Sequence, residues 1–218
     1  MSRARLIVDR LLAHYPEAEC TLDYQSPWEL MVGAILASQC TDQRVNLITP
    51  DLFEAYPDME AMAKADQESI EVLIRSCGLF RSKARALKGS ARAILDQHQG
   101  QVPRTAEDLM ALPGVGRKIA NLLLGDAFGQ QAVVVDTHCG RISRLIGFTD
   151  SDKPLQIERD LMEVLPQDTW TLWGHLMVAH GRALCRARCR DCLACPIRSL
   201  CRYGQGLDMT GLKEGDCV

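Results

Sequence analysis

With 218 residues, the chain is long enough for one or two domains with a buried core, and its 47% hydrophobic and 24% charged residues exclude the disordered and fibrous classes. The formal net charge of -3 gives no overall basic excess, so any contact with nucleic acid must come from a local surface. The first residues lack a secretory signal and no uncharged apolar stretch approaches membrane-spanning length, which predicts a cytosolic protein without membrane contact.

Helical spacing dominates the chain from its beginning. Apolar residues recur at intervals of three and four, as in residues 6–12 and 119–123. A helix start is predicted at Ser26, because a proline follows this capping serine and a glutamate stands three residues beyond it. Asp58 and Thr105 are predicted to cap further helices.

Strand signals are nearly absent, since the three valines at 133–135 are too few to imply a sheet. We therefore predict an all-α chain of about ten short helices. Breaks are expected where proline or glycine occurs between helical patterns, near residues 101–103, 112–114, 128–130 and 152–154. The basic runs at 81–88 and 182–202 are each expected to form a solvated helix face unless they contact DNA.

Residues 112–118 read Leu-Pro-Gly-Val-Gly-Arg-Lys and separate two helical patterns. Glycines at 114 and 116 allow a tight turn and a close approach of the backbone to a ligand. The amides of the following helix would then point outward and bind phosphate, as a helix-hairpin-helix grips DNA without reading its sequence. Lys118 would lie in the first turn of that helix, either as a solvated side chain or as an amine nucleophile that forms a Schiff base with a sugar aldehyde.

Asp136 follows the apolar residues 133–135 and precedes the next helical pattern. Its position predicts an N-cap for the helix that begins there. Capping and catalysis can coexist at one carboxylate.

The ten cysteines are expected to stay reduced, because the chain has no secretion signal, and the scattered ones are expected to behave as small buried hydrophobes. Four of them, at the spacing C-x6-C-x2-C-x5-C, predict a metal site: Cys185, Cys192, Cys195 and Cys201. Zinc and a cubane iron-sulfur cluster both take four thiolates, so the ligand type leaves the metal open. Cys189 offers an alternative quartet in which it replaces Cys185.

Three motifs together resemble the endonuclease III branch of the helix-hairpin-helix glycosylases: residues 112–121, residues 134–138 and the cysteine quartet. Residues 37–42 and 78–84 extend the resemblance over most of the chain. It implies a six-helix barrel domain at 22–130, which holds the helix-hairpin-helix motif, and a discontinuous iron-sulfur cluster domain at 1–21 and 131–218. It also favours a 4Fe-4S cluster over zinc and Cys185 over Cys189 as the first ligand, which leaves Cys189 as a spare thiol.

The resemblance implies a bifunctional enzyme of base excision repair. It would remove oxidised or ring-saturated pyrimidines from double-stranded DNA, acting as a monomer, and would cleave 3′ to abasic sites. In the implied mechanism the damaged base is flipped out, Asp136 assists by electrostatics and proton transfer, and Lys118 attacks the sugar C1′. The resulting Schiff base then undergoes β-elimination.

The resemblance also implies the residues that contact DNA. Gln39 would fill the gap left by the flipped base, and Leu79 would wedge into the opposite strand. Without the resemblance, these two would be interpreted as a helix-terminal amide and an exposed loop hydrophobe. The hairpin would contribute further contacts through Leu112, Gly114, Gly116 and Arg117.

Two related branches differ at defined positions. A thymine-mismatch glycosylase is expected to carry tyrosine where Lys118 stands, and an adenine glycosylase a glutamate near Ala34. This chain shows neither change, which favours lyase activity, although Cys139 and Gly140 are smaller than expected after His138. The alternatives are a DNA-binding or redox-sensing cluster protein without glycosylase activity, and a zinc-bearing version of the same fold.

Overall fold

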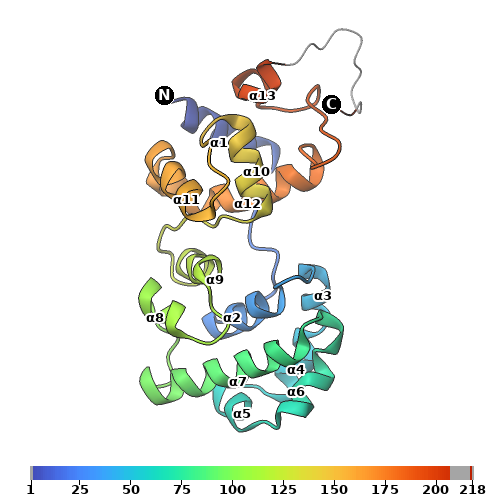
Figure 1. Ribbon diagram of the computed structural model, residues 1–218, viewed down its shortest axis with the longest axis vertical. Helices are drawn as coiled ribbons and strands as arrows, with labels where there is room; N and C mark the ends of the chain where they lie inside the picture. The colour runs from blue at the N-terminus through green and yellow to red at the C-terminus, as the bar shows by residue number, and fades with distance from the viewer. Residues whose placement is uncertain (1, 207–216, 218) are drawn as a thin grey trace. The chain divides into compact units, whose positions relative to one another are not determined.

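The computed structural model describes residues 2–206 and Cys217. The chain forms two compact units, of which unit 1 comprises Met1–Glu19 with Gln131–Val218 and unit 2 comprises Cys20–Gln130. In the described residues both units are helical, and β-structure is limited to one isolated bridge between Cys185 and Arg190 (Figure 1). The predicted all-α class is therefore confirmed.

Unit 2 is built on one long helix, α7 (Phe80–Gln97). This helix buries Leu87, Ala91 and Ile94 on one face and packs against α2, α5 and α6. The remaining helices of unit 2 are α2 (Pro27–Leu36), α3 (Asp42–Asn46), α4 (Thr49–Ala55), α5 (Met59–Lys64), α6 (Gln67–Leu73), the 3-10 helix η1 (Arg75–Cys77), α8 (Ala106–Ala111), α9 (Arg117–Leu122) and the π-helical turn η2 (Leu123–Ala127).

Unit 1 joins the N-terminal helix to the C-terminal part of the chain. Its core contains Trp173, which is fully buried and donates from Nε1 to Ser143 Oγ at 3.2 Å. The helices of unit 1 are α1 (Arg3–His14), α10 (Thr137–Ile146), α11 (Pro154–Val164), η3 (Gln167–Thr169), α12 (Trp170–Ala183), η4 (Arg198–Leu200) and α13 (Arg202–Gln205).

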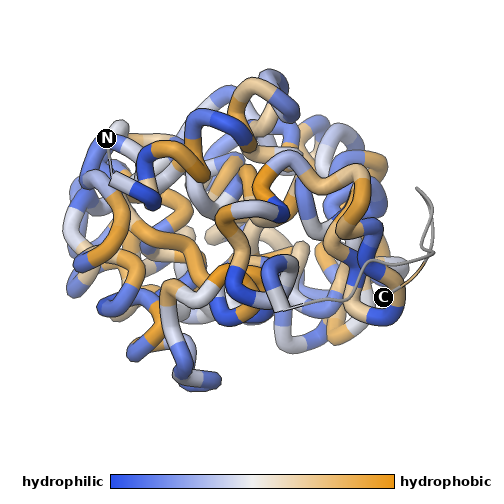
Figure 2. The backbone as a smooth tube through the Cα atoms, turned by 90° about the horizontal axis from the view of Figure 1, so that it is seen from above, coloured by the Kyte–Doolittle hydropathy of each residue, from blue (hydrophilic) through white to orange (hydrophobic). Residues whose placement is uncertain are grey.

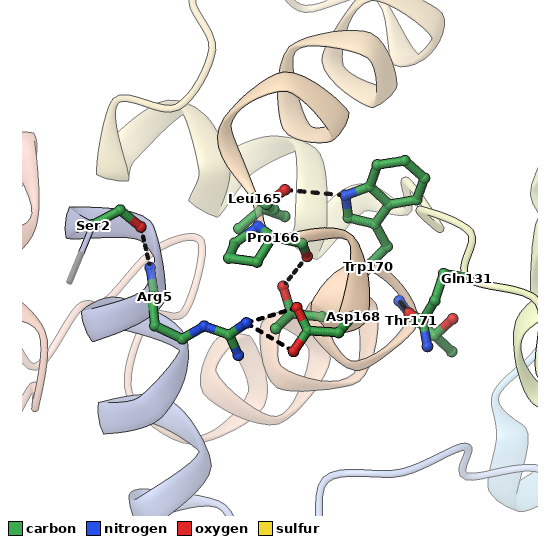
Figure 3. A network of polar contacts seen from close by, with 9 residues as sticks. Ser2, Arg5, Gln131, Leu165, Pro166, Asp168, Trp170 and Thr171 are labelled. Carbon is green, nitrogen blue, oxygen red and sulfur yellow. Dashed lines mark hydrogen bonds and ion pairs between the residues drawn. The ribbon is translucent and has the colours of Figure 1, made fainter.

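Polar contacts fasten α1 to the rest of unit 1 (Figure 3). Arg5 Nη2 donates to the two carboxylate oxygens of Asp168, at 2.6 and 2.7 Å. The pKa of Asp168 is lowered, chiefly by this hydrogen bond. The Arg3 guanidinium donates to the backbone carbonyls of Ile146 and Leu200. An N-terminal helix that is remote in sequence is thus held by charged and carbonyl partners as well as by its apolar face.

The helix starts predicted from capping residues are confirmed. Ser26 Oγ accepts a hydrogen bond from Glu29 N at 3.2 Å, while Glu29 in turn accepts from Gln25 N at 2.8 Å. Asp58 and Thr105 each accept from the amide three residues later. These bonds satisfy amides that have no partner inside the helix, which is why the sequence pattern locates the helix starts.

The described residues form thirteen α-helices instead of about ten. The difference comes from helices of four to seven residues, such as α3 and α13, which are too short to show a clear apolar period. Hydrophobic and hydrophilic stretches follow one another at short intervals along the backbone, as Figure 2 shows. No helix in the described part of the chain is long and apolar enough to cross a membrane.

Candidate functional site

The predicted hairpin connects α8 to α9. Its apolar residues point inward, because Leu112 and Val115 are 3% and 5% exposed. The backbone of Leu112 is bonded within the hairpin as well, because Leu112 N donates to Leu109 O at 3.2 Å and Leu112 O accepts from Val115 N at 3.1 Å. Ser90 Oγ of α7 donates to Pro113 O at 2.6 Å, which anchors the turn to this helix.

The two hairpin glycines have different surroundings. Gly114 has φ +79°, a left-handed conformation, and a Cβ added there would lie 2.7 Å from Ala86 Cβ on α7. Gly116 has φ -92°, and a Cβ there would meet nothing within 4 Å. Gly114 is thus required for the shape of the turn, whereas Gly116 leaves the surface of the turn open.

Gly116 is the N-cap of α9, and among the described residues no side chain caps this helix start. Lys118 lies in the first turn of α9 and is exposed, as is Arg117. Backbone amides at such an N-terminus favour an anion, and a nearby cation adds to the attraction. The hairpin therefore combines a helix start of the kind that favours anions with an accessible amine.

Two turns of unit 2 contain exposed residues in a strained backbone conformation. Gln39 follows α2 with φ 56°, and Leu79 precedes α7 with φ 48°. Both are exposed, and Leu79 is 55% accessible. A left-handed conformation costs a residue with a side chain roughly 1–2 kcal/mol. Strain of this kind persists only where the surrounding structure fixes it.

One residue that holds these turns was not identified from the sequence. Lys83, within the basic run 81–88, was expected on a solvated helix face, but it is only 4% exposed. Its Nζ donates to the carbonyls of Leu36 and Cys77, both at 2.8 Å. The expectation was wrong for this residue because its partners come from other turns, and no feature of the run itself marks Lys83 as buried.

Asp136 belongs to unit 1, where it forms the N-cap of α10 as predicted. Its Oδ1 accepts a hydrogen bond from Cys139 N at 2.7 Å. Cys139 is fully buried, and burial raises the pKa of its thiol to about 12, so it is a neutral core side chain. The smaller residues after His138 thus serve packing: a Cβ on Gly140 would come within 3.3 Å of Ile157.

The four predicted ligands of the metal site line one cavity of unit 1. Cys185, Cys192, Cys195 and Cys201 share this cavity with apolar side chains of α10, including Ile142, and with Arg190 and Arg198. Burial raises the pKa of the Cys185 and Cys192 thiols, and that of Cys195 to about 12. In the described residues, no three metal-ligating side chains lie close enough together to hold a single ion.

The cavity wall also contains a buried histidine. His180 is 2% exposed, with Nδ1 2.9 Å from the Tyr15 hydroxyl and Nε2 3.7 Å from Cys195 Sγ. Burial, with smaller contributions from the charges of His14 and Arg141, lowers its pKa to about 4. Near neutral pH this imidazole is therefore uncharged, which suits a wall of the cavity.

Cys189 does not line the cavity. It forms a disulfide with Cys217, with a Cα–Cα distance of 4.5 Å and a sequence separation of 28 residues. The expectations that Cys189 is a spare thiol and that all ten cysteines stay reduced are therefore wrong for this pair. Sequence spacing gave no signal, because the pairing depends on where the chain returns in space.

Comparison with known proteins identifies the class of protein to which the chain belongs. Residues 32–167 match the family model described as HhH-GPD superfamily base excision DNA repair protein. The hairpin between α8 and α9 lies inside this range. The match therefore identifies a helix-hairpin-helix protein of base excision repair.

The relatives identify the branch. The chain is 47% identical to Endonuclease III of Synechocystis sp. over 93% of each chain, and 38% identical to that of Bacillus subtilis over 97% of each. It also resembles a solved structure of a trapped endonuclease III–DNA covalent intermediate, with a TM-score of 0.87 and 40% identity over 92% of this chain and 95% of that one. A thermostable thymine-DNA glycosylase shares the fold at 22% identity, with a TM-score of 0.85 over 94% and 98% of the two chains.

The chain therefore belongs to the endonuclease III family and is an enzyme of the DNA glycosylase and AP lyase class.

Proposed function

We propose that this enzyme removes oxidised or ring-saturated pyrimidines from double-stranded DNA and cleaves the strand 3′ to the abasic site through a Schiff base on Lys118. The observation that carries the proposal is an exposed amine in the first turn of α9. In the described residues, no side chain caps this helix start, which directly follows the hairpin. Phosphates bound at the hairpin would bring a sugar of the same strand to this amine.

Each step has a chemical role for a named side chain. Lys118 Nζ bonds to C1′ of the sugar, the bond from C1′ to the base breaks, and the base leaves with a proton. Asp136 stabilises the charge that develops on the sugar and handles that proton. The bond from C1′ to the ring oxygen O4′ then breaks, O4′ takes a proton, and the nitrogen forms the Schiff base with C1′. Loss of a proton from C2′ then breaks the bond from C3′ to the 3′ phosphate oxygen, and the phosphate leaves with that electron pair, which nicks the strand. The amine is finally released when water hydrolyses the imine.

Gln39 and Leu79 are proposed to support the flipped state. Both project into solvent from turns of unit 2, so they are available to replace the missing base and to wedge into the opposite strand. The hairpin backbone at Gly114 and Gly116 would bind phosphate together with Arg117, while the buried Leu112 would support the turn from inside. One copy of the chain suffices for these contacts, which supports a monomer.

A 4Fe-4S cluster is proposed for the cavity of unit 1. The donor set fits this group, because four thiols line the same largely apolar cavity, while the disulfide withdraws Cys189 from the alternative quartet. Cys185, Cys192, Cys195 and Cys201 would hold the cluster, and when bound it would fix the fold of the arginine-rich loop at 185–201. Unit 2 would then correspond to the barrel domain and unit 1 to the cluster domain.

Borohydride trapping tests the proposal. Borohydride reduces a Schiff base to a stable amine, so the wild-type enzyme should be trapped on duplex DNA that contains an abasic site or thymine glycol. Lys118→Gln should be trapped on neither, while the exposed Lys153→Gln serves as a matched control and should behave like the wild type. A trapped Lys118→Gln adduct would reject Lys118 as the nucleophile. A wild-type enzyme that binds but is never trapped would reject the lyase mechanism.

A further inference from the structure

The buried ammonium of Lys83 joins two helix ends in unit 2. Leu36 is the last residue of α2 and Cys77 is the last residue of η1, and Lys83 Nζ donates to both carbonyls at 2.8 Å. Carbonyls at the C-terminal end of a helix lack partners inside it and carry partial negative charge, so they attract a cation. One side chain of α7 thus completes two separate elements.

The two carbonyls lie just before the two strained residues. Gln39 comes three residues after Leu36, and Leu79 comes two residues after Cys77. Both turns therefore begin just after a carbonyl group that the same ammonium binds. The distance between these points is set by two hydrogen bonds to one nitrogen atom.

A second contact links the same turns. Cys40, the residue that follows Gln39, is a neighbour of the Cys77 thiol and contributes to the shift of its pKa. Burial, with a smaller contribution from this contact, raises the pKa of Cys77 to about 11, so the thiol is neutral. The Gln39 and Leu79 turns are thus joined on the inner side while their side chains project outward.

The choice of lysine at this position needs an explanation. Burial lowers the pKa of Lys83, which means that the folded state disfavours its charged form. An apolar side chain of similar length would fill the space without that penalty. What it would lack is the pair of hydrogen bonds, so the ammonium serves to fix the two carbonyls.

We propose that Lys83 is a positioning residue that holds the Gln39 and Leu79 turns in register, so that both side chains enter the duplex together when a base is flipped. The inference rests on the proposed function, in which these two residues contact DNA. It makes a specific distinction between substrates. A single strand has no opposite strand to wedge and no stack to refill, so its reaction at Lys118 does not need the register.

The test compares borohydride trapping rates on an abasic site in a duplex and in a single-stranded oligonucleotide. Lys83→Met keeps the length of the side chain and removes its donors. Its ratio of duplex to single-strand rates should fall about tenfold or more, which is the loss of about 1.4 kcal/mol in the duplex transition state. Lys88→Met is the matched control, because Lys88 lies on the same helix and donates to Ala65 O at 2.7 Å rather than to the carbonyls that precede the two turns. Its ratio should equal that of the wild type.

The outcomes separate this inference from the proposed function. If the wild type is not trapped at all, the proposed function fails. If the wild type is trapped and Lys83→Met leaves the ratio unchanged, or lowers both rates equally, only the positioning role is overturned. A double variant of Lys83→Met with Gln39→Ala should cost less than the two single losses together, because both act on the same step.

A milder variant covers the case in which Lys83→Met does not fold. Lys83→Gln shortens the side chain and keeps an uncharged amide donor in place of the ammonium that binds Leu36 O and Cys77 O. Its duplex to single-strand ratio should fall about two- to threefold, as expected when one of these two hydrogen bonds is lost. A folded Lys83→Gln protein with an unchanged ratio would overturn the inference.

Discussion

Replacing Gly114 by alanine should destabilise the enzyme strongly, for two reasons that the structure separates. The φ of +79° imposes a left-handed conformation that costs an alanine roughly 1–2 kcal/mol. The new Cβ would also lie 2.7 Å from Ala86 Cβ, and such overpacking typically costs about 1–3 kcal/mol. Ala86 has no side-chain torsion with which to move away, so the backbone of the hairpin or of α7 must shift. The sum is about 2–5 kcal/mol, a fall in Tm on the order of 10 °C.

Gly116→Ala is the matched control for this prediction. With φ -92° and open space around the added Cβ, it should leave stability unchanged or raise it by up to about 1 kcal/mol. It should nevertheless weaken DNA binding, because a methyl group then covers the turn proposed to meet phosphate. Thermal denaturation and fluorescence anisotropy with an abasic-site duplex measure the two effects separately.

A double variant divides the cost of Gly114→Ala into its parts. Adding Ala86→Gly removes the clash but leaves the backbone strain, so the pair should recover about half of the loss once the cost of Ala86→Gly alone is subtracted. The reasoning would be refuted if Gly114→Ala melted at the wild-type temperature. It would also be refuted if Gly116→Ala were the more destabilising of the two.

Three further predictions concern unit 1. Asp136→Asn should keep the cap of α10 and the Tm but slow excision roughly 100-fold or more, whereas Asp136→Ala should also lose about 1 kcal/mol of stability. Denaturation measures the stability and single-turnover excision the rate, and equal stability of the two variants would contradict the capping role. Arg5→Met should lower the Tm at about pH 7, and the difference in Tm from the wild type should disappear as the pH falls through the lowered pKa of Asp168, because protonation of this carboxylate removes the stability that the ion pair contributes. An equal difference in Tm at about pH 2 would disprove the contribution of this ion pair. Cys185→Ser should abolish the broad visible absorption of a purified cluster, whereas Cys189→Ser should retain it, and iron analysis that gave the reverse would favour the alternative quartet.

Features fixed by neighbouring residues were predictable from the sequence. The cap at Asp136 depends on a bond between residues three positions apart, so the order of residue types is enough to locate it. The hairpin was predictable for the same reason, because a left-handed turn needs glycine at Gly114. The all-α class followed from the apolar period, which is also a local property.

Features fixed by distant residues were not predictable in this way. Lys83 finds Leu36 O 47 residues away, and Arg5 finds Asp168 163 residues away. The disulfide of Cys189 joins residues 28 positions apart and competes with a ligand spacing that looks equally plausible in the sequence. In each case, residue types alone do not say which partner the folded chain brings near.

Helix α7 also sets the spacing between the Gln39 and Leu79 turns and the hairpin. Lys83, Ala86 and Ser90 are spaced by three and four residues, so they lie along one side of the helix. Lys83 anchors the Gln39 and Leu79 turns, and Ala86 and Ser90 contact the hairpin. Seven residues of α-helix span about 10 Å, close to three nucleotide steps along a DNA strand. Inserting or deleting a single residue between Lys83 and Ser90 would rotate one anchor by about 100° relative to the other, so this stretch should tolerate changes of side chain on its outer face but no change of length.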